Sequence, residues 1–487
     1  MAMLKLKEQG WWVLVAVIMV VVCWLTHGQY AHWGDDYALY LQQARAIEDG
    51  NIRQLVERQH FLLAHTAADV SPLVYPWGVP LLQRTAMNLV PAPLAAGWCL
   101  NTLGQIVAML AALAKLQKPL GKSLALALAI LVLAHPALAY SRMDASSDSL
   151  ALSISLLLVF AWYRPLPVPA RRLVVWAGAG GLLLGVAITL RLTLVCLLPW
   201  AAWQLWRQGR LAGVNTWRLW GVWGLALLLV ALPVYTLLPW PLYTKTFSYT
   251  TWGQPLAWWG RQLLFWLQTM RQEFWAHSQL PWLWIPALPL LAVGWYRAGG
   301  YLKALAGVAM LQLWVVVESP YPPYLRYCLL LIPLVMWLVA LGALQLSKWP
   351  KHYWRRLAPP IITMAAWVSA LGLLWASAKH TRHQDRLLAS YGPQSKGFME
   401  AIETIKAEEA QRPVCFAKPR LLYAHLPNPL FNGTIDSLMQ WPPNTLLLAA
   451  KDNPLLQSLT PNEKALLAAA AYKAKWQNAY FEIYEQR

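Results

Sequence analysis

The sequence predicts a polytopic α-helical membrane protein of about eleven transmembrane helices with a small C-terminal α/β soluble domain. Of the 487 residues, 58% are hydrophobic and 13% are charged, whereas a typical soluble domain has about 25% charged residues. Apolar runs of spanning length recur through most of the chain. The 31 tryptophans are typical of a protein whose rings lie at the membrane–water interface. The apolar excess excludes intrinsic disorder.

The apolar runs that predict membrane spans are separated by short polar or basic segments. They cover residues 11–27, 92–114, 123–140, 147–163, 173–190, 192–206, 219–238, 281–296, 304–317, 328–346 and 358–378. The first run has the basic start of a signal peptide, but no small-residue cleavage site follows Trp24, so we interpret it as a span. The two runs that meet at Arg191 are short and tightly joined.

The distribution of charge predicts the orientation. A net charge of +19 would suggest nucleic-acid binding in a soluble protein. Here, with the N-terminus in the cytoplasm and the spans alternating, the basic residues gather in the cytoplasmic loops, where Glu8 is the only acid before residue 379. Since cytoplasmic loops of membrane proteins are enriched in Lys and Arg, we expect the segment after the last span to lie outside the cytoplasm.

Three regions are not predicted to span. The first outer loop, residues 28–91, is long, and the apolar spacing from Tyr37 to Ile47 predicts a helix along the membrane surface. A second outer loop covers residues 239–280. The tail, residues 379–487, has nearly balanced charge and reads as an α/β domain, with a helix over 397–410 and strands over 413–417, 445–449 and 480–484. We therefore divide the chain into a membrane domain, 1–378, and a soluble domain, 379–487.

Asp35 and Asp36 are the first candidates for chemistry, because they follow the first span by a few residues. A carboxyl group between lipid and water has a raised pKa unless a cation or hydrogen bonds offset the low dielectric, and it is then suited to accept a proton. The plainer interpretation is that Asp35 caps the helix that follows.

Four further motifs appear in a fixed order after this acidic pair. They are Ser71–Pro–Leu–Val–Tyr–Pro–Trp–Gly–Val–Pro80, Tyr140–Ser–Arg–Met–Asp–Ala–Ser–Ser–Asp148, Arg191–Leu–Thr193 and Tyr324–Leu–Arg–Tyr327. With the long first outer loop and the soluble tail, this ordered set resembles the GT-C superfamily of integral-membrane glycosyltransferases. Within it, the sequence is most similar to the bacterial branch of protein O-mannosyltransferases and lipid A aminoarabinose transferases. It departs from that pattern at Trp77, where proline is usual, and at Asp36, where glutamate is common.

The resemblance implies a specific reaction. Such enzymes sit in the bacterial inner membrane and move a sugar from a polyprenyl-phosphate donor to a hydroxyl or phosphate of an envelope acceptor on the periplasmic face. Asp35 then matches the general base, Asp36 its neighbour, and Asp148 a second acidic position, for which Asp144 is an alternative in register. Some members use a divalent cation (Mg or Mn), whose ligands here would be Asp35 and Asp148.

The departing lipid phosphate requires cations on the outer side of the membrane. Arginine suits this role because its planar guanidinium binds two phosphate oxygens. The candidate substrate-binding residues are Tyr75, Arg84, Arg191, Lys245, Arg326 and Tyr327. For each cation, the ordinary alternative is a surface charge or a partner for an acid.

Two other classes of function stay open on the sequence. A transporter or flippase of lipid-linked sugars would show ionisable or broken sites at mid-membrane and repeated halves. No predicted span carries an acid at its middle, and no repeat is evident, although Arg191 between two short runs fits a broken helix. A non-catalytic scaffold for envelope assembly would bind no lipid phosphate.

Overall fold

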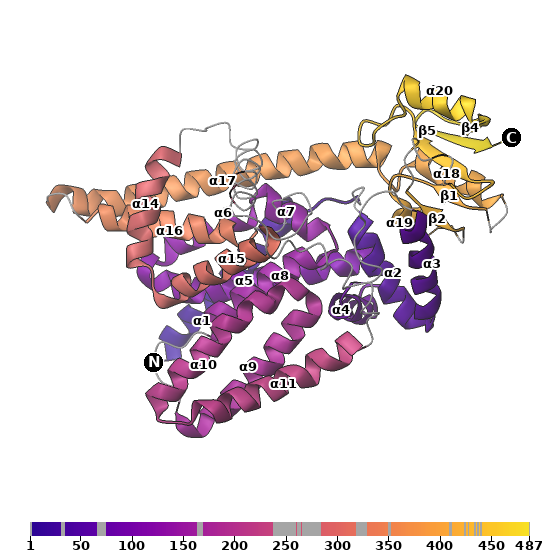
Figure 1. Ribbon diagram of the computed structural model, residues 1–487. Coiled ribbons are helices and arrows are strands. Elements are labelled where there is room, and N and C mark those ends of the chain that lie inside the picture. Colours follow the sequence, from indigo (N-terminus) through magenta and orange to yellow (C-terminus); the bar gives the residue numbers. More distant parts are fainter. Residues whose placement is uncertain are drawn as a thin grey trace.

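The protein is a helical bundle with a small sheet domain at one end (Figure 1). The computed structural model describes residues 2–30, 35–65, 75–162, 169–236, 260, 264, 284–317, 329–348, 352–408 and 412–486, apart from 423–424, 427, 433–434, 436–437 and 439–440. The first part comprises α1 (Ala2–Leu25), α2 (Asp35–Asp49), α3 (Ile52–His65), α4 (Gly78–Met87), α5 (Pro93–Leu120), α6 (Lys122–Leu133), α7 (Pro136–Met143) and α8 (Ser147–Trp162). The bundle continues with α9 (Ala170–Leu190), the 3₁₀ helix η1 (Leu192–Leu197), α10 (Leu198–Ala212), α11 (Thr216–Thr236), α14 (Trp284–Arg297), α15 (Gly300–Val317), α16 (Leu331–Leu346) and α17 (His352–Tyr391).

Every apolar run predicted from the sequence overlaps a helix of the bundle. The run 123–140 is bent by 57° between α6 and α7, where Pro136 opens the second helix. The run 192–206 begins as η1, because the backbone at Arg191 is extended and ends α9. Among the described residues, five helices are long and apolar enough to cross a membrane, or six if the bent pair is one span. These helices confirm a polytopic membrane fold, and the count of eleven spans stays a prediction.

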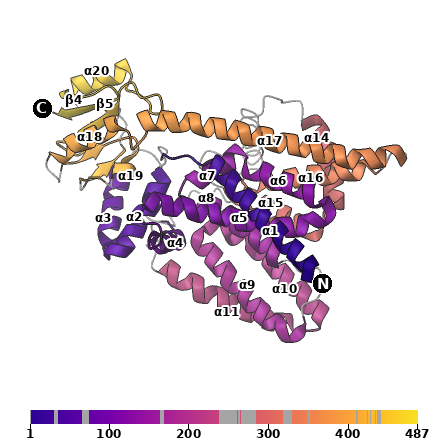
Figure 2. The same cartoon turned by 180° about the vertical axis from the view of Figure 1, so that it is seen from behind.

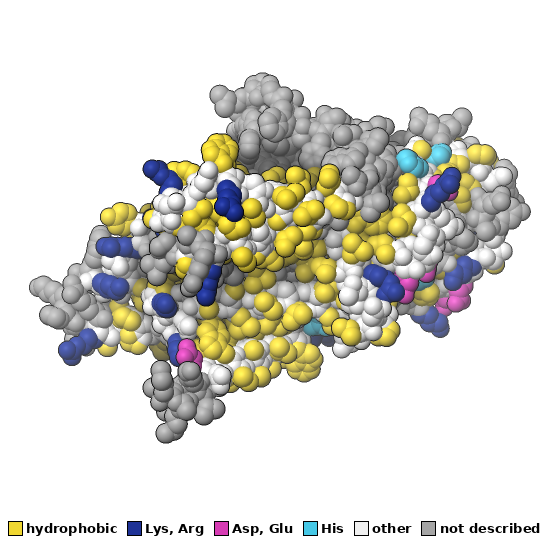
Figure 3. Space-filling model, turned by 90° about the horizontal axis from the view of Figure 1, so that it is seen from below, with side chains coloured by type: hydrophobic (Ala, Val, Ile, Leu, Met, Phe, Trp, Pro, Cys, Tyr) yellow, Lys and Arg dark blue, Asp and Glu magenta, His cyan; other side chains and the backbone are white. Residues whose placement is uncertain are grey.

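The hydrophobic surface has the form expected of a chain in lipid. Large apolar side chains such as Val175 and Trp217 are 73% and 76% exposed. In Figure 3 hydrophobic side chains cover the middle of the molecule; the end away from the sheet domain shows mainly Lys and Arg, whereas the sheet end shows both signs of charge. Such a band of exposed hydrophobic side chains is stable in contact with lipid and unfavourable in contact with water.

Small residues bring helices of the bundle close together. A Cβ at Gly294 of α14 would overlap the carbonyl of Leu338, and one at Gly342 of α16 would overlap that of Leu290. Glycine at both positions therefore lets the backbones of α14 and α16 touch. In a membrane, where no hydrophobic effect drives helices together, close approach of the backbones stabilises a helix pair through van der Waals contacts.

The C-terminal residues form a five-stranded sheet of order β2-β1-β3-β5-β4. The elements of this sheet domain are α18 (Lys396–Lys406), β1 (Val414–Cys415), α19 (Pro419–Leu422), β2 (Leu430–Phe431), β3 (Leu446–Ala450), α20 (Pro461–Ala469), β4 (Tyr472–Gln477) and β5 (Phe481–Gln486). β1 pairs in parallel with β2 and β3, while β5 pairs antiparallel with β3 and β4. The apolar face of α18, including Phe398 and Ile402, packs in one buried cluster with Phe481 and Ile483 of β5.

Helix α17 connects the bundle to the sheet domain. It is 40 residues long and runs along the bundle before it reaches the sheet, as both views show (Figures 1 and 2). The Ser377 hydroxyl donates to the carbonyl of Ala134 at 2.5 Å, and the Trp367 indole donates to the Ser123 hydroxyl at 3.0 Å. Ser123 lies at the start of α6 and Ala134 directly after its end, so the two bonds hold α17 alongside the whole of α6.

Candidate functional site

The candidate site lies where α2 meets the turn between α7 and α8. The predicted surface helix is present as α2, which begins at Asp35. Tyr37 and Ala38 are buried in one cluster with Ala145, and the Tyr40 hydroxyl donates to the Ser147 hydroxyl at 2.8 Å. The first turns of α2 are therefore held against residues 143–147, which we call the α7–α8 segment.

A buried ion pair forms the centre of this region. Asp148, in the first turn of α8, pairs through Oδ1 with the Nη1 of Arg191, and their side chains are only 5% and 16% exposed. Arg191 also donates from Nη1 to the Ser147 hydroxyl at 3.0 Å and from Nε to the Thr193 hydroxyl at 3.1 Å. The Ser146 hydroxyl donates to the other oxygen of Asp148 at 3.2 Å. The guanidinium thus has a fixed position and a compensated charge.

Tyr75 lies beside this pair. Its ring stacks on that of Tyr40, with centroids 4.2 Å apart and an interplanar angle of 12°. The Gln43 amide donates to the Tyr75 carbonyl at 3.0 Å and accepts from the Tyr75 N–H at 2.9 Å. Because Tyr40 and Arg191 both donate to the Ser147 hydroxyl, a continuous set of contacts joins Tyr75 to Arg191.

Arg84 belongs to α4 and contacts the end of α2 that is farthest from Asp35. It pairs with Glu48 at 3.2 Å and donates to the Asn88 side chain at 2.6 Å. Arg84 thus has an acidic partner, and its role in substrate binding stays a prediction.

Several predicted site residues lie outside the described part of the chain. The backbones of Asp35 and Asp36 open α2, while their side chains are not among those described. Lys245, Arg326 and Tyr327 fall in undescribed segments. Their roles, and the capping role of Asp35, stay predictions.

Buried amide side chains that were not among the predicted site residues hold the α7–α8 segment. Asn101 of α5 donates to the Asp144 carbonyl at 2.9 Å, Gln105 donates to the Ser149 hydroxyl at 2.8 Å, and Gln83 of α4 donates to the Ala145 carbonyl at 2.6 Å. Asn101 and Gln105 stand four residues apart in an apolar run, so they lie on one helix face. Polar residues in such a run were a signal that could have marked them.

Arg142 is the other buried cation near this segment. It is 2% exposed and donates to the Gln105 side-chain oxygen at 2.7 Å, the Leu133 carbonyl at 2.9 Å and the Thr26 hydroxyl at 2.6 Å. It therefore ties α7 to the ends of α1 and α6 and to the middle of α5. Since its side chain is buried, it acts on the site through packing.

The described residues offer no ready set of metal ligands. No group of three His, Cys, Asp or Glu side chains within the described ranges is close enough to hold an ion. Both oxygens of Asp148 already have protein partners, one of them a guanidinium. The Asp35 side chain, the other predicted ligand, lies outside the described residues, so the metal role of Asp35 and Asp148 stays a prediction.

The sheet domain rests on α2 and α3, as Figure 1 shows. Buried Arg420 of α19 donates to the Gln59 side chain at 3.3 Å, and Arg58 of α3 donates to the Leu426 carbonyl at 2.5 Å. His425 lies at this contact, where burial, with the charges of Lys406 and Arg45, lowers its pKa below the usual 6.5. The Gln42 side chain of α2 also donates to the Arg420 carbonyl at 2.5 Å, so the helix that begins at Asp35 contacts the sheet domain as well as the α7–α8 segment.

A comparison with solved structures identifies the architecture. The chain matches ArnT from Cupriavidus metallidurans bound to undecaprenyl phosphate, with a TM-score of 0.60 and 14% sequence identity over 98% of each chain. The chain has the GT-C fold. The apo form of ArnT from the same organism also matches this chain, with a TM-score of 0.58 and 14% sequence identity over 98% of both chains. No protein-family model and no curated protein sequence matches the chain. The predicted resemblance to GT-C proteins is thus confirmed in the fold.

Proposed function

We propose that the protein is a glycosyltransferase that moves a sugar from a polyprenyl-phosphate donor to an envelope acceptor. The observation that carries the proposal is the Asp148–Arg191 pair beside the first turns of α2, in a fold shared over 98% of the chain with an ArnT bound to undecaprenyl phosphate. We place the chain in the bacterial inner membrane, with the site and the sheet domain on the periplasmic side. The sugar is a hexose or a pentose.

In the proposed reaction Asp35 is the general base. The acceptor hydroxyl attacks the anomeric carbon, its proton passes to the Asp35 carboxylate, and the bond between that carbon and the phosphate oxygen breaks. The products are the glycosylated acceptor and the polyprenyl phosphate. A positioned base of this kind typically contributes about 10²–10⁴-fold to the rate.

Arg191 is the residue that we assign to the departing phosphate. Negative charge grows on the phosphate as the bond breaks, and a fixed cation stabilises it most when the site need not reorganise. The Arg191 side chain is 16% exposed, against 5% for Asp148. We therefore assign phosphate contact to Arg191 and give Asp148 the supporting role of orienting it. Tyr75, beside this pair, supplies an aromatic face on which a sugar ring can stack.

Transfer from a labelled polyprenyl-phosphate sugar by the purified protein tests the proposal. Asp35→Asn should lower the transfer rate by at least about 10²-fold, the typical contribution of a general base. Asp49→Asn, at the exposed last residue of the same helix, is the matched control and should keep the rate. Full activity of both Asp35→Asn and Asp148→Asn would show that the assigned mechanism is wrong.

A flippase for lipid-linked sugars is the alternative, and one observation favours it. The helix break at Arg191, where η1 joins α9 to α10, is the kind of discontinuity that transporters use to bind anions within the membrane. Vesicles that contain the purified protein separate the two functions. Movement of the labelled donor across the bilayer without sugar transfer would support the flippase.

A further inference from the structure

A groove on the outside of the bundle takes no part in the proposed transfer. A cavity of about 490 Å³ lies between the end of α1 and the second half of α17, which is within the roughly 300–1,000 Å³ of small-molecule sites. Its apolar lining consists of Leu25, Leu371, Leu374, Trp375 and Ala378. The contacts of Asp148 and Arg191 described above involve none of these residues.

The groove opens toward the lipid. In the most apolar stretches of α17 and α1, only 6% and 22% of residues are buried, against 44% for α5 and 56% for α9. α1 and α17 are therefore on the perimeter of the bundle. Leu371 and Trp375 are 56% and 67% exposed within the described residues. A hollow between two perimeter helices is within reach of bilayer lipid.

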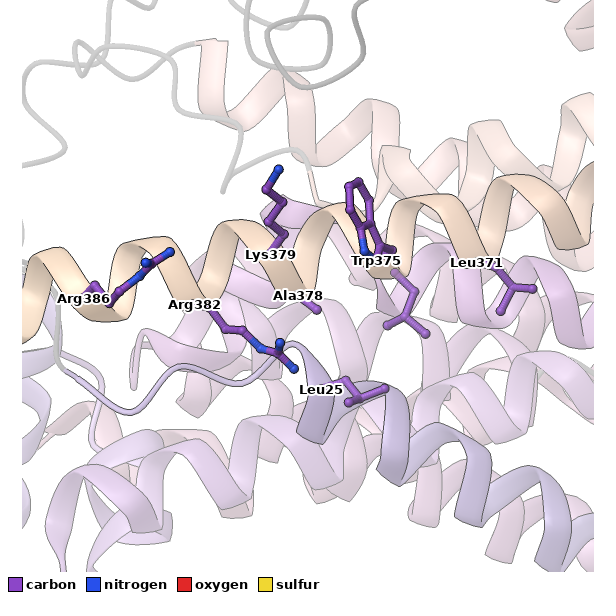
Figure 4. Close-up of a pocket in the computed structure, with 8 residues that line it drawn as sticks. Leu25, Leu371, Trp375, Ala378, Lys379, Arg382 and Arg386 are labelled. Atoms are coloured by element: carbon purple, nitrogen blue, oxygen red, sulfur yellow. The ribbon is translucent and has the colours of Figure 1, made fainter.

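Three cations line the end of the groove that leads toward the sheet domain. Lys379, Arg382 and Arg386 follow at intervals of three and four residues, so they share one face of α17. In Figure 4 Arg382 extends from α17 toward Leu25 at the end of α1, while Lys379 stands beside Trp375. The Lys379 ammonium lies 5.2 Å from the Trp375 ring centroid.

These cations have no acidic partner among the residues that the structure describes. The acid nearest in the chain, Asp385, accepts the backbone N–H of Gln29 at 2.8 Å and so holds the start of the first loop. Three exposed positive charges next to an apolar hollow match a ligand with an anionic head and a hydrocarbon chain.

We propose that this groove binds an anionic phospholipid of the leaflet on the side of the sheet domain. The acyl chain lies along Leu371, Leu374 and Trp375, and the phosphodiester is held by Arg382 and Arg386. Basic pockets between membrane helices recognise acidic headgroups in this way, and Trp375 marks the depth of the interface. The inference is independent of the proposed transfer reaction.

Photo-crosslinking of the full-length protein in nanodiscs tests the proposal. The probe is phosphatidylglycerol with a photoreactive acyl chain, and phosphatidylcholine with the same chain is the neutral reference. Each cation near an anionic lipid contributes about fivefold in affinity, so labelling of peptides from α17 by the acidic probe should exceed labelling by the neutral one at least about tenfold. Equal labelling by the two probes would overturn the proposal.

Variants locate the lipid and guard against misfolding. Lys379→Gln/Arg382→Gln/Arg386→Gln should abolish the preference for the acidic probe, whereas Arg207→Gln/Arg210→Gln, near the C-terminal end of α10, should keep it. Ala378→Trp fills the groove without altering charge and should remove labelling from a protein that elutes as a single species. Persistent acidic preference in the triple variant, or unchanged labelling of Ala378→Trp, would refute the site.

Competition separates the phospholipid from the donor. Unlabelled phosphatidylglycerol should displace the acidic probe from α17, and undecaprenyl phosphate at the same concentration should displace it less. Stronger displacement by undecaprenyl phosphate would assign the groove to the donor and contradict the proposal.

Discussion

The ion pair between Asp148 and Arg191 makes a quantitative prediction about stability. Each side chain is mostly buried, and each has hydroxyl partners besides the other. Removing one member of a buried pair leaves the other charge uncompensated and costs about 3–5 kcal/mol. Because Arg191 retains 16% exposure, we expect the lower end of that range, about 3 kcal/mol, for either Asp148→Asn or Arg191→Met.

A double-mutant cycle isolates the interaction. Asp148→Asn/Arg191→Met leaves no unpaired charge, so it should cost no more than one single variant, and two single costs of about 3 kcal/mol then give a coupling energy of at least about 3 kcal/mol. The assay is the free energy of unfolding in mixed micelles, followed by circular dichroism as the denaturing detergent is raised. Costs that add to within about 0.5 kcal/mol would refute the reasoning.

The pair Arg84–Glu48 provides the control cycle. Its side chains are 29% and 42% exposed, and surface pairs of this kind contribute about 0–1 kcal/mol. Arg84→Met/Glu48→Gln should therefore show weak coupling that falls further at high salt. Coupling as large as that of the buried pair would mean that burial does not set the difference.

Three further predictions concern packing, pH and a helix cap. Gly78→Ala should lower the free energy of unfolding in mixed micelles by about 1–3 kcal/mol, because the added Cβ would lie 2.6 Å from the Thr189 carbonyl. Gly221→Ala, with open space around it, should not destabilise the protein in the same assay. The lowered pKa of His425 means that the unfolded chain binds more protons, so stability should fall as pH drops below 6.5, and a pH series on His425→Gln that keeps the full dependence would contradict this. Thr460→Ala removes a capping box and should cost about 0.5–2 kcal/mol, and an unchanged unfolding midpoint would contradict the capping role.

The membrane domain could be predicted from the sequence because a helix that crosses lipid requires a long run of hydrophobic residues. Helix ends were harder to predict, since tertiary contacts set them. The bend between α6 and α7 depends on Pro136, and the break at Arg191 depends on the extended backbone at that residue. In the sheet domain, the predicted strands overlap β1, β3 and β5, which are buried. β4 was missed because its residues are mostly exposed and polar, and β2 is only two residues long.

The candidate site was predictable where a residue type was unusual for its position. Asp148 and Arg191 stand out as charges at the ends of apolar runs, but their pairing joins residues 43 positions apart and depends on how α8 and α9 pack. Tyr40 and Gln43 look like ordinary helix residues, and only the fold brings them to Ser147 and Tyr75. The contact of Arg84 with Glu48 likewise joins two helices and could not be inferred from the sequence.

The most direct test is an experimental structure of the full-length protein with undecaprenyl phosphate bound. The account predicts that the phosphate lies within hydrogen-bond distance of the Arg191 guanidinium, with Asp148 still paired behind it and the Asp35 carboxylate facing the same space. A phosphate bound away from Arg191, with the Asp35 side chain directed into open solvent, would contradict it.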